Sequence, residues 1–140
     1  VSSREGRFVR EIWGVGTPRS FRPIWVCEEM GLEYRHHAIG PRTGETQQPA
    51  FTRLNRKQKI PFYRDSEVAL SESVAICRYL TRHSDNGTFY IPQTKKSLAE
   101  EDEWCAYIYG EIDQSGLYII RRHGDLSAIY GESPHAVSGA

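Results

Sequence analysis

The sequence lacks an excess of charge of either sign, a long hydrophobic run and a paired set of cysteines. Its 140 residues include 18 Lys and Arg against 18 Asp and Glu, so the formal net charge is zero. Because a neutral chain has no general attraction for a polyanion, we expect no nucleic-acid partner. No apolar run approaches membrane-spanning length and no signal peptide opens the chain, so we expect a cytoplasmic protein without membrane contact.

Cysteine is scarce as well, with only Cys27, Cys77 and Cys105 in the chain. Their odd number and their spacing fit neither a disulfide framework nor a metal site. We therefore expect reduced thiols in the core and no bound metal. The length fits one domain, or one domain and part of another, on a scale of about 100–200 residues per domain.

Apolar periodicity and turn residues divide the first part of the chain into short alternating elements. The predicted elements, in chain order, are a strand over residues 8–15, a helix over 20–30, a strand over 33–39, a short helix over 49–54, two short strands joined by a turn at Asp65-Ser66, and a helix that starts at Ser71 to Ser73. The order strand, helix, strand predicts a parallel right-handed crossover.

The composition changes after residue 83. Residues 84–93 combine turn residues with an extended stretch closed by Pro92, which is typical of a linker. From Thr94 a long helical pattern follows, and Ser97-Leu98-Ala99-Glu100 matches a capping box near its start. The last predicted elements are a loop over residues 124–132 and a helix opened by Ser133-Pro134.

The stretch from Asn55 to Ser73 carries the most chemical information. Pro61 lies at the entry of a short strand, where a proline is tolerated only if its missing N–H faces away from the ladder. If the Ile60–Pro61 bond is cis, both backbone polar groups of Ile60 face outward and can pair with an extended peptide.

Ser71, Glu72 and Ser73 precede the apolar positions of the next helix, so we expect them in its cap and first turn. Free N–H groups there attract a carboxylate, and the Glu72 side chain can accept an ammonium. Recognition of backbone, ammonium and carboxylate together predicts a site for a small peptide. The alternative is an ordinary strand proline and an ordinary helix cap, but the order of proline, hairpin and Glu-Ser pair favours the peptide site.

This order of motifs resembles the N-terminal, thioredoxin-like domain of the cytosolic glutathione transferases. The family pattern Asn-Pro-x-Gly-x-Val/Ile-Pro, followed by two short strands and a Glu-Ser pair, corresponds to Asn55 to Pro61 followed by Glu72-Ser73. Arg56 and Gln58 replace the family's proline and glycine, which should affect the shape of the loop more than the ligand contacts.

The resemblance implies an α/β thioredoxin-like βαβαββα domain followed by the beginning of an all-α C-terminal domain. The implied boundaries are residues 8–83 for the first domain, 84–93 for a linker and 94–140 for the incomplete helical domain. Since the family's remaining helices are missing, we expect the chain to be part of a longer protein or poorly soluble alone.

The resemblance also implies an activity. Members of the family conjugate the thiolate of glutathione, a co-substrate, to small apolar electrophiles, sometimes with a glutathione peroxidase side activity, and they are usually homodimers. Ile60, Pro61, Glu72 and Ser73 would bind glutathione. Gln47 stands where some plant-type members carry a basic residue that holds the glycine carboxylate, and Lys59 either restores that positive charge or is an ordinary surface lysine.

Catalysis in the family requires a donor that lowers the pKa of the glutathione thiol, because a free thiol near pKa 8.5 is only a few per cent ionised at neutral pH. Thr17 and Ser20 are the candidates, in a segment that resembles the family's Ser/Thr-Pro-x-x-x-Lys/Arg entry. Thr17 would face the sulfur in that register, whereas Ser20 is expected to be the better helix N-cap. A backbone N–H remains a third possibility.

Other functions stay open at this stage. A glutathione-fold module could bind the peptide, or serve in assembly, without catalysis, and isomerase or dehalogenase chemistry is possible on the same scaffold. The aromatic set of the long helix, which either lines a pocket for the electrophile or packs in a core or interface, consists of Trp104, Tyr107, Tyr109 and Tyr118.

Overall fold

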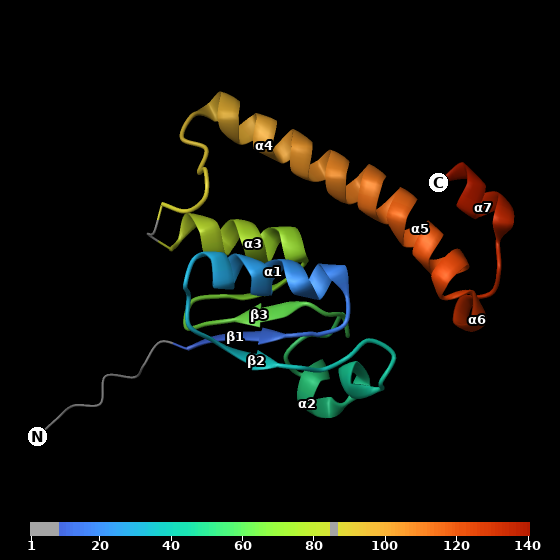
Figure 1. Cartoon of the computed structure of the whole chain (residues 1–140). Coiled ribbons are helices and arrows are strands. Elements are labelled where there is room, and N and C mark those ends of the chain that lie inside the picture. Colours follow the sequence, from blue (N-terminus) through green and yellow to red (C-terminus); the bar gives the residue numbers. More distant parts are fainter. Residues whose placement is uncertain (1–8, 85–86) are drawn as a thin grey trace, which may run out of the picture. The chain divides into compact units, whose positions relative to one another are not determined.

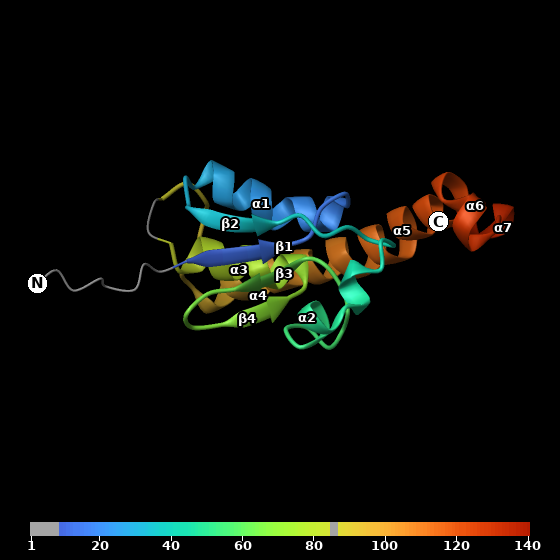
Figure 2. The same ribbon diagram turned by 90° about the horizontal axis from the view of Figure 1, so that it is seen from below.

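Four short strands lie side by side in the first half of the chain, in the order β2-β1-β3-β4 (Figure 2). The computed structural model describes residues 9–84 and 87–140, and the chain divides into two compact units between Ile91 and Pro92. The elements of the first unit are β1 (Arg10–Trp13), α1 (Pro18–Glu29), β2 (Tyr34–His37), the short 3-10 helix η1 (Glu45–Gln47), α2 (Pro49–Thr52), β3 (Phe62–Arg64), β4 (Ala69–Ser71) and α3 (Ser73–Arg82).

This order confirms the predicted βαβαββα domain. β1 and β2 are parallel, as the crossover through α1 requires, and β3 pairs antiparallel with both β1 and β4. α1 and α3 cover one face of the sheet and α2 lies on the other (Figure 1). The expected leader over residues 1–7, Phe8 and residues 85–86 of the expected linker lie outside the described residues.

Side chains alternate across the sheet, so successive residues of one strand belong to different cores. Ile12 and Tyr63 belong to the core under α1 and α3, which also contains Cys27, Ile76 and Leu80. Trp13 and Phe62 point to the other face and pack with Phe51 of α2. Each core is therefore assembled from segments far apart in the sequence, and the sheet fixes their relative positions.

The predicted strands and the short helix are one to two residues shorter at their ends in the structure, and two predictions at the site's helix starts were wrong. α1 begins at Pro18, because Thr17 is its N-cap and proline has no N–H to leave unpaired at the first helical position. Ser71 is the last residue of β4, where it pairs with Phe62, and does not belong to the first turn of α3.

The second unit is helical, as predicted. Its elements are α4 (Lys95–Tyr107), the π-helical segment η2 (Ile108–Leu117), α5 (Tyr118–Ile120), the π-helical segment η3 (Arg121–Asp125), α6 (Ser127–Tyr130) and α7 (Pro134–Gly139). The first four follow one another as a single helical run (Figure 1). The helix predicted at Ser133-Pro134 is confirmed as α7. In the described residues 9–84 and 87–140, no helix is long and apolar enough to cross a membrane.

Two predictions fail in the second unit. The capping box joins Thr94 and Ser97, with 3.1 Å from each backbone nitrogen to the opposite hydroxyl oxygen, and does not involve Glu100. The loop expected over residues 124–132 is largely helical, since the helical run continues to Asp125 and α6 follows.

In the aromatic set of the long helix, the rings of Trp104 and Tyr107 pack edge to face with their centroids 6.1 Å apart, and both residues are at least half exposed.

Candidate functional site

The loop before β3 is organised by the buried side chain of Asn55, which is 6% exposed. Its amide donates to the carbonyl of Lys59 at 2.8 Å, and its oxygen accepts from the Lys57 backbone N–H at 3.1 Å. The Gln58 N–H donates to the Asn55 carbonyl at 3.0 Å. One side chain therefore sets the path of the chain as it approaches Ile60.

Gln58 occupies the position where the family pattern has glycine, and its φ of 55° explains that preference. This left-handed region is uncommon for residues other than glycine because the Cβ atom crowds the backbone. The loop thus keeps the shape that a glycine would allow, at a cost in conformational energy.

The Ile60–Pro61 peptide bond is cis, which is the condition set for an outward-facing Ile60 backbone. Pro61 is buried, and the Ile60 side chain packs against the core of Trp13, Phe51 and Phe62. Within the described residues, neither backbone polar group of Ile60 forms a hydrogen bond with another backbone group. These two groups are therefore available to a ligand main chain.

Gly14, just after β1, brings the loop close to the start of α1. A Cβ atom on Gly14 would lie 2.9 Å from Cβ of Ile60 and 3.0 Å from Cβ of Ser20, and the φ of Gly14 is +129°. Both the close approach and the dihedral require glycine. The turn at Ile60 and the first turn of α1 can consequently pack directly against the same backbone atom.

The start of α3 combines an exposed carboxylate with a buried hydroxyl. Glu72 is the N-cap, with φ 78° and ψ 114°, and its side chain makes no capping bond to the helix. Ser73, which is 3% exposed, accepts a hydrogen bond from Nη1 of Arg22 in α1 at 3.2 Å. Non-glycine residues with such a dihedral cluster at ligand sites, and the first N–H groups of a helix lack internal partners.

Thr17 and Ser20 form a closed capping box at the start of α1. The Ser20 N–H donates to Oγ1 of Thr17 at 3.0 Å, and the Thr17 N–H donates to Oγ of Ser20 at 3.2 Å. The two hydroxyl oxygens are 2.8 Å apart. The prediction that Ser20 is the N-cap was wrong: Thr17 has the extended backbone of a cap, and Ser20 lies in the third helical position with 1% exposure.

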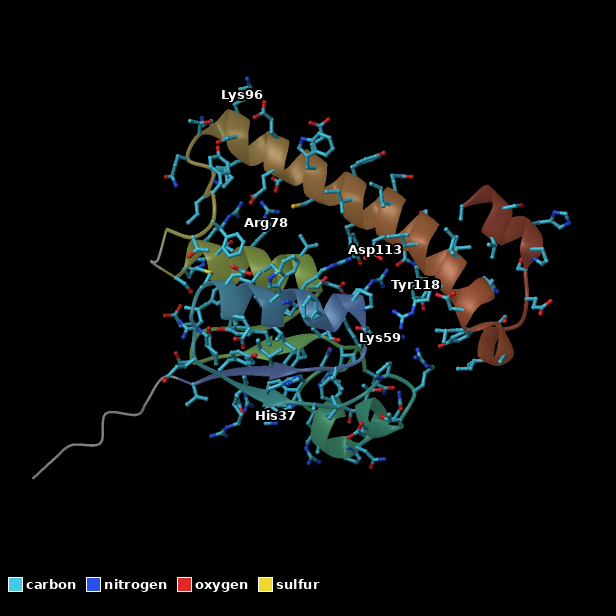
Figure 3. All side chains as sticks on the ribbon, viewed as in Figure 1. His37, Lys59, Arg78, Lys96, Asp113 and Tyr118 are labelled. Atoms are coloured by element: carbon cyan, nitrogen blue, oxygen red, sulfur yellow. The ribbon has the colours of Figure 1, made fainter. Side chains whose placement is uncertain are left out.

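Gln47 and Lys59, the two residues predicted for the glycine carboxylate, are both exposed. The Gln47 amide donates to Oγ1 of its neighbour Thr46 at 2.7 Å. Figure 3 shows Lys59 at the end of the first unit where α1 and α3 begin. Among the described residues, no hydrogen bond or ion pair joins either side chain to another predicted site residue, so their role stays a prediction.

Sequence reasoning assigned no role to several residues that connect the site. Lys57 forms an ion pair with Glu72, with Nζ 3.4 Å from Oε1, and Arg22 binds Ser73. Neither bond has a signature in sequence spacing, because the partners are 15 and 51 residues apart. The close approach of Ile60 and Ser20 to the backbone of Gly14 was also missed. A glycine directly after a strand is a sequence signal for such an approach.

The cysteines were expected to be reduced thiols in the core, and Cys27 is buried while Cys77 and Cys105 are partly buried. All three are free, and burial raises the pKa of Cys27 to about 12 and that of Cys77 to about 11. Such thiols stay protonated at neutral pH and react slowly. In the part of the chain that the structure describes, no group of three or more His, Cys, Asp or Glu side chains could hold a metal ion.

Comparison with known proteins identifies the fold and the family. A family model described as "Glutathione S-transferase, N-terminal domain" matches residues 11–82. Glutathione S-transferase theta-1 of Bos taurus is 31% identical over 112 residues, which are 79% of this chain and 47% of that protein. The chain therefore spans about half the length of this curated relative.

Solved structures of the same family share the fold. Human glutathione S-transferase T1-1 in its apo form superposes with a TM-score of 0.76 at 23% identity, over 93% of this chain and 56% of that one. A theta-class glutathione S-transferase of Xanthomonas axonopodis pv. citri, solved with glutathione bound, also superposes with a TM-score of 0.76. Its identity is 22%, over 94% of this chain and 62% of that one. The family match covers β1 through α3. The chain belongs to the glutathione S-transferase family.

Proposed function

We propose that this chain contains the glutathione-binding part of a glutathione transferase that conjugates the glutathione thiolate to small apolar electrophiles. The observation that carries the proposal is the convergence of three segments in one unit. The cis Ile60–Pro61 turn packs on Gly14 next to Ser20, and its loop reaches Glu72 through Lys57. The backbone, ammonium and carboxylate groups of one small peptide can meet their partners there.

Each part of glutathione has a candidate partner in this arrangement. The cysteinyl main chain pairs with the free backbone groups of Ile60, as an extended peptide pairs with a strand edge. The ammonium binds the Glu72 carboxylate. The carboxylate of the γ-glutamyl group binds Ser73 and the free N–H groups at the start of α3, where the helix dipole favours a negative charge. Gln47 and Lys59 remain the candidates for the glycine carboxylate.

Proton counting at the capping box favours Thr17 over Ser20 as the donor to the sulfur. Ser20 is almost fully buried, whereas Thr17 is partly exposed. A hydroxyl has one proton and can accept further bonds. If the Ser20 hydroxyl donates to Oγ1 of Thr17 across 2.8 Å, the Thr17 proton is free to point at a thiolate. Ser20 is then a positioning residue that orients the Thr17 hydroxyl.

In the proposed reaction, the Thr17 hydroxyl stabilises the thiolate and so lowers the pKa of the bound thiol. The sulfur lone pair forms a C–S bond with the electrophilic carbon, and the leaving group departs with its electron pair. In the peroxidase side reaction, two glutathione thiols are oxidised to the disulfide while one hydroperoxide is reduced to an alcohol and water.

One observation favours a second candidate, a module that binds glutathione without turnover. The Ser20 hydroxyl also lies 3.0 Å from the Thr17 carbonyl, and a proton donated there leaves the Thr17 proton bonded to Ser20. The capping box would then be only structural. Glutathione binding with no product from any electrophile would support this second candidate.

Calorimetric titration with glutathione tests the proposal. We expect saturable binding by the wild type and its loss in the double variant Glu72→Gln with Ser73→Ala. The variant should still unfold cooperatively, at a lower midpoint temperature because Ser73→Ala removes the bond from Arg22. The matched control is Glu132→Gln with Ser133→Ala, the same pair of changes before α7, where Glu132 is exposed and the Ser133 side chain makes no capping bond to the helix. A folded wild type that does not bind glutathione would overturn the proposal.

Activation of the thiol is tested separately, with a chlorodinitrobenzene as electrophile. Thr17→Val should lower kcat and raise the pKa of the bound thiol, while Thr17→Ser should restore both. Ser20→Ala should shift the same pKa by a smaller amount, because it removes only the orienting bond. An unchanged thiol pKa in Thr17→Val would exclude Thr17 as the donor.

The homodimer and the cytoplasmic location stay predictions. Sedimentation of the whole protein tests the homodimer.

A further inference from the structure

Lys57 and Glu72 form an ion pair at the point where the proposed function, on which this inference rests, requires a ligand ammonium. Nζ of Lys57 lies 3.4 Å from Oε1 of Glu72, and the two side chains are 59% and 50% exposed. The Glu72 carboxylate makes no capping bond to α3 and stands on a residue with φ 78°. It is therefore presented outward, toward either a lysine or a ligand.

The position of Lys57 is set by its own loop. Its backbone N–H is bound to the buried Asn55 side chain at 3.1 Å, and the next residue, Gln58, donates to the Asn55 carbonyl at 3.0 Å. The lysine side chain is thus attached to a fixed backbone close to Glu72. Because the lysine ammonium is tethered so close to Glu72, its effective concentration at the carboxylate is in the millimolar range.

We propose that Lys57 is an internal competitor for the ammonium site of glutathione, and that it sets the affinity of the chain for peptides that carry a free α-amino group. A lysine ammonium and a peptide ammonium need the same partner, a carboxylate oxygen. The ligand must either displace Lys57 from Oε1 or bind beside a second positive charge. In both cases Lys57 weakens binding of an ammonium-bearing peptide.

The same geometry predicts selectivity. A ligand without the α-amino group does not need the Glu72 carboxylate, so its binding does not require Lys57 to leave Oε1 of Glu72. Removal of the lysine should consequently favour glutathione over its deamino analogue. Because the ion pair is exposed, the difference should shrink as ionic strength rises.

Calorimetry on three proteins tests this inference: the wild type, Lys57→Met and the control Lys96→Met. Lys96 also forms an exposed ion pair, 3.5 Å from Glu100, so the control removes one charge and one pair elsewhere. The two probes are glutathione and glutarylcysteinylglycine. We expect Lys57→Met to bind glutathione roughly twofold to fivefold more tightly at low salt, the range for an exposed pair that no longer has to be broken. The control should equal the wild type.

The possible outcomes separate this inference from the proposed function. Binding of glutarylcysteinylglycine that is unchanged or weaker in Lys57→Met, together with tighter glutathione binding, supports competition at Glu72. Unchanged glutathione binding, or equal weakening for both probes, overturns the inference and leaves the glutathione site intact. If none of the folded proteins binds glutathione, the proposed function fails first and the inference fails with it.

Discussion

Arg22 of α1 donates a hydrogen bond from Nη1 to Oγ of Ser73, the first residue of α3, across 3.2 Å. The two helices cover the same face of the sheet, and this bond connects their N-terminal ends. With Arg22 as its donor, the Ser73 hydroxyl keeps its own proton for a ligand carboxylate. Arg22 therefore orients a proposed binding residue.

Replacing Arg22 with methionine should weaken glutathione binding several-fold, because Ser73 loses the bond that orients it. The variant should also lose about 1–3 kcal/mol of unfolding free energy, the scale of a hydrogen bond from a charged donor. Calorimetric titration and thermal unfolding measure the two effects. Arg53→Met, at an exposed arginine after α2, is the control and should change neither. Wild-type affinity in Arg22→Met would contradict the orienting role.

Gly14→Ala should destabilise the first unit by about 3 kcal/mol or more, since it adds overpacking to backbone strain. The new Cβ would lie 2.9 Å from Ile60 and 3.0 Å from Ser20. Gly31→Ala is the matched control, because its φ is +62° but nothing lies within 4 Å. It should cost only about 1 kcal/mol, the strain alone. Equal losses in chemical denaturation would show that the close approach at Gly14 is unimportant.

Gln58→Gly should stabilise the fold by roughly 0.5–1 kcal/mol, because the left-handed φ of 55° suits glycine better than glutamine. The same change at Gln48, where φ is −67°, should lose roughly 0.5 kcal/mol, since glycine brings only its conformational entropy there. Chemical denaturation of both variants measures the difference. A loss of stability in Gln58→Gly would mean that the glutamine side chain contributes more than the dihedral costs.

The ionised Glu11 side chain should contribute unfolding free energy that is lost at acidic pH. The hydrogen bond from Arg64 holds the pKa of Glu11 below its usual range, and His37 contacts the same carboxylate at 3.0 Å. His37 lies on the sheet face opposite α1 and α3 (Figure 3). Nη1 of Arg35 also lies 3.8 Å from Oε1 of Glu11.

The sign of the effect follows from the lowered pKa. The ionised carboxylate stabilises the folded state fully above the unfolded-state pKa, and this contribution disappears as pH falls through the lower folded-state value. Between about pH 6 and pH 3, the wild type should therefore lose more unfolding free energy than Glu11→Gln. Chemical denaturation at several pH values measures both slopes. Parallel slopes would exclude Glu11 as a source of the acid sensitivity.

Local sequence predicted the order of elements because each has its own signal. Pro61, the hairpin turn after β3 and the Glu72-Ser73 pair stand in the order that the family motif requires, and the structure has the same order. The start of α1 was missed by two residues, although Pro18 is a strong marker of a first helical position, which makes Thr17 the cap. Two hydroxyl residues three apart can each serve as a cap, and only the backbone of Thr17 decides between them.

Contacts between distant segments had no local signal. The bonds from Arg22 to Ser73 and from Lys57 to Glu72 depend on how α1, the loop and α3 meet in three dimensions. Residues 124–132 were predicted as a loop, but the helical run continues through Gly124 to Asp125. A single glycine lowers helix propensity by about 1 kcal/mol, which neighbouring interactions can offset.

Asn55 gives the loop before Ile60 an uneven tolerance to mutation. The family pattern has the same asparagine together with a proline and a glycine, which restrict or extend the backbone directly. In this chain, three hydrogen bonds to the buried Asn55 fix the path of the loop, two through its side chain and one through its carbonyl. Arg56 is thereby released from the requirement for a proline and can vary for other purposes, such as surface charge, whereas Gln58 keeps a left-handed φ of 55°. A substitution at Asn55 should therefore disturb the backbone of the whole loop, because it removes the two side-chain bonds that hold the loop in place.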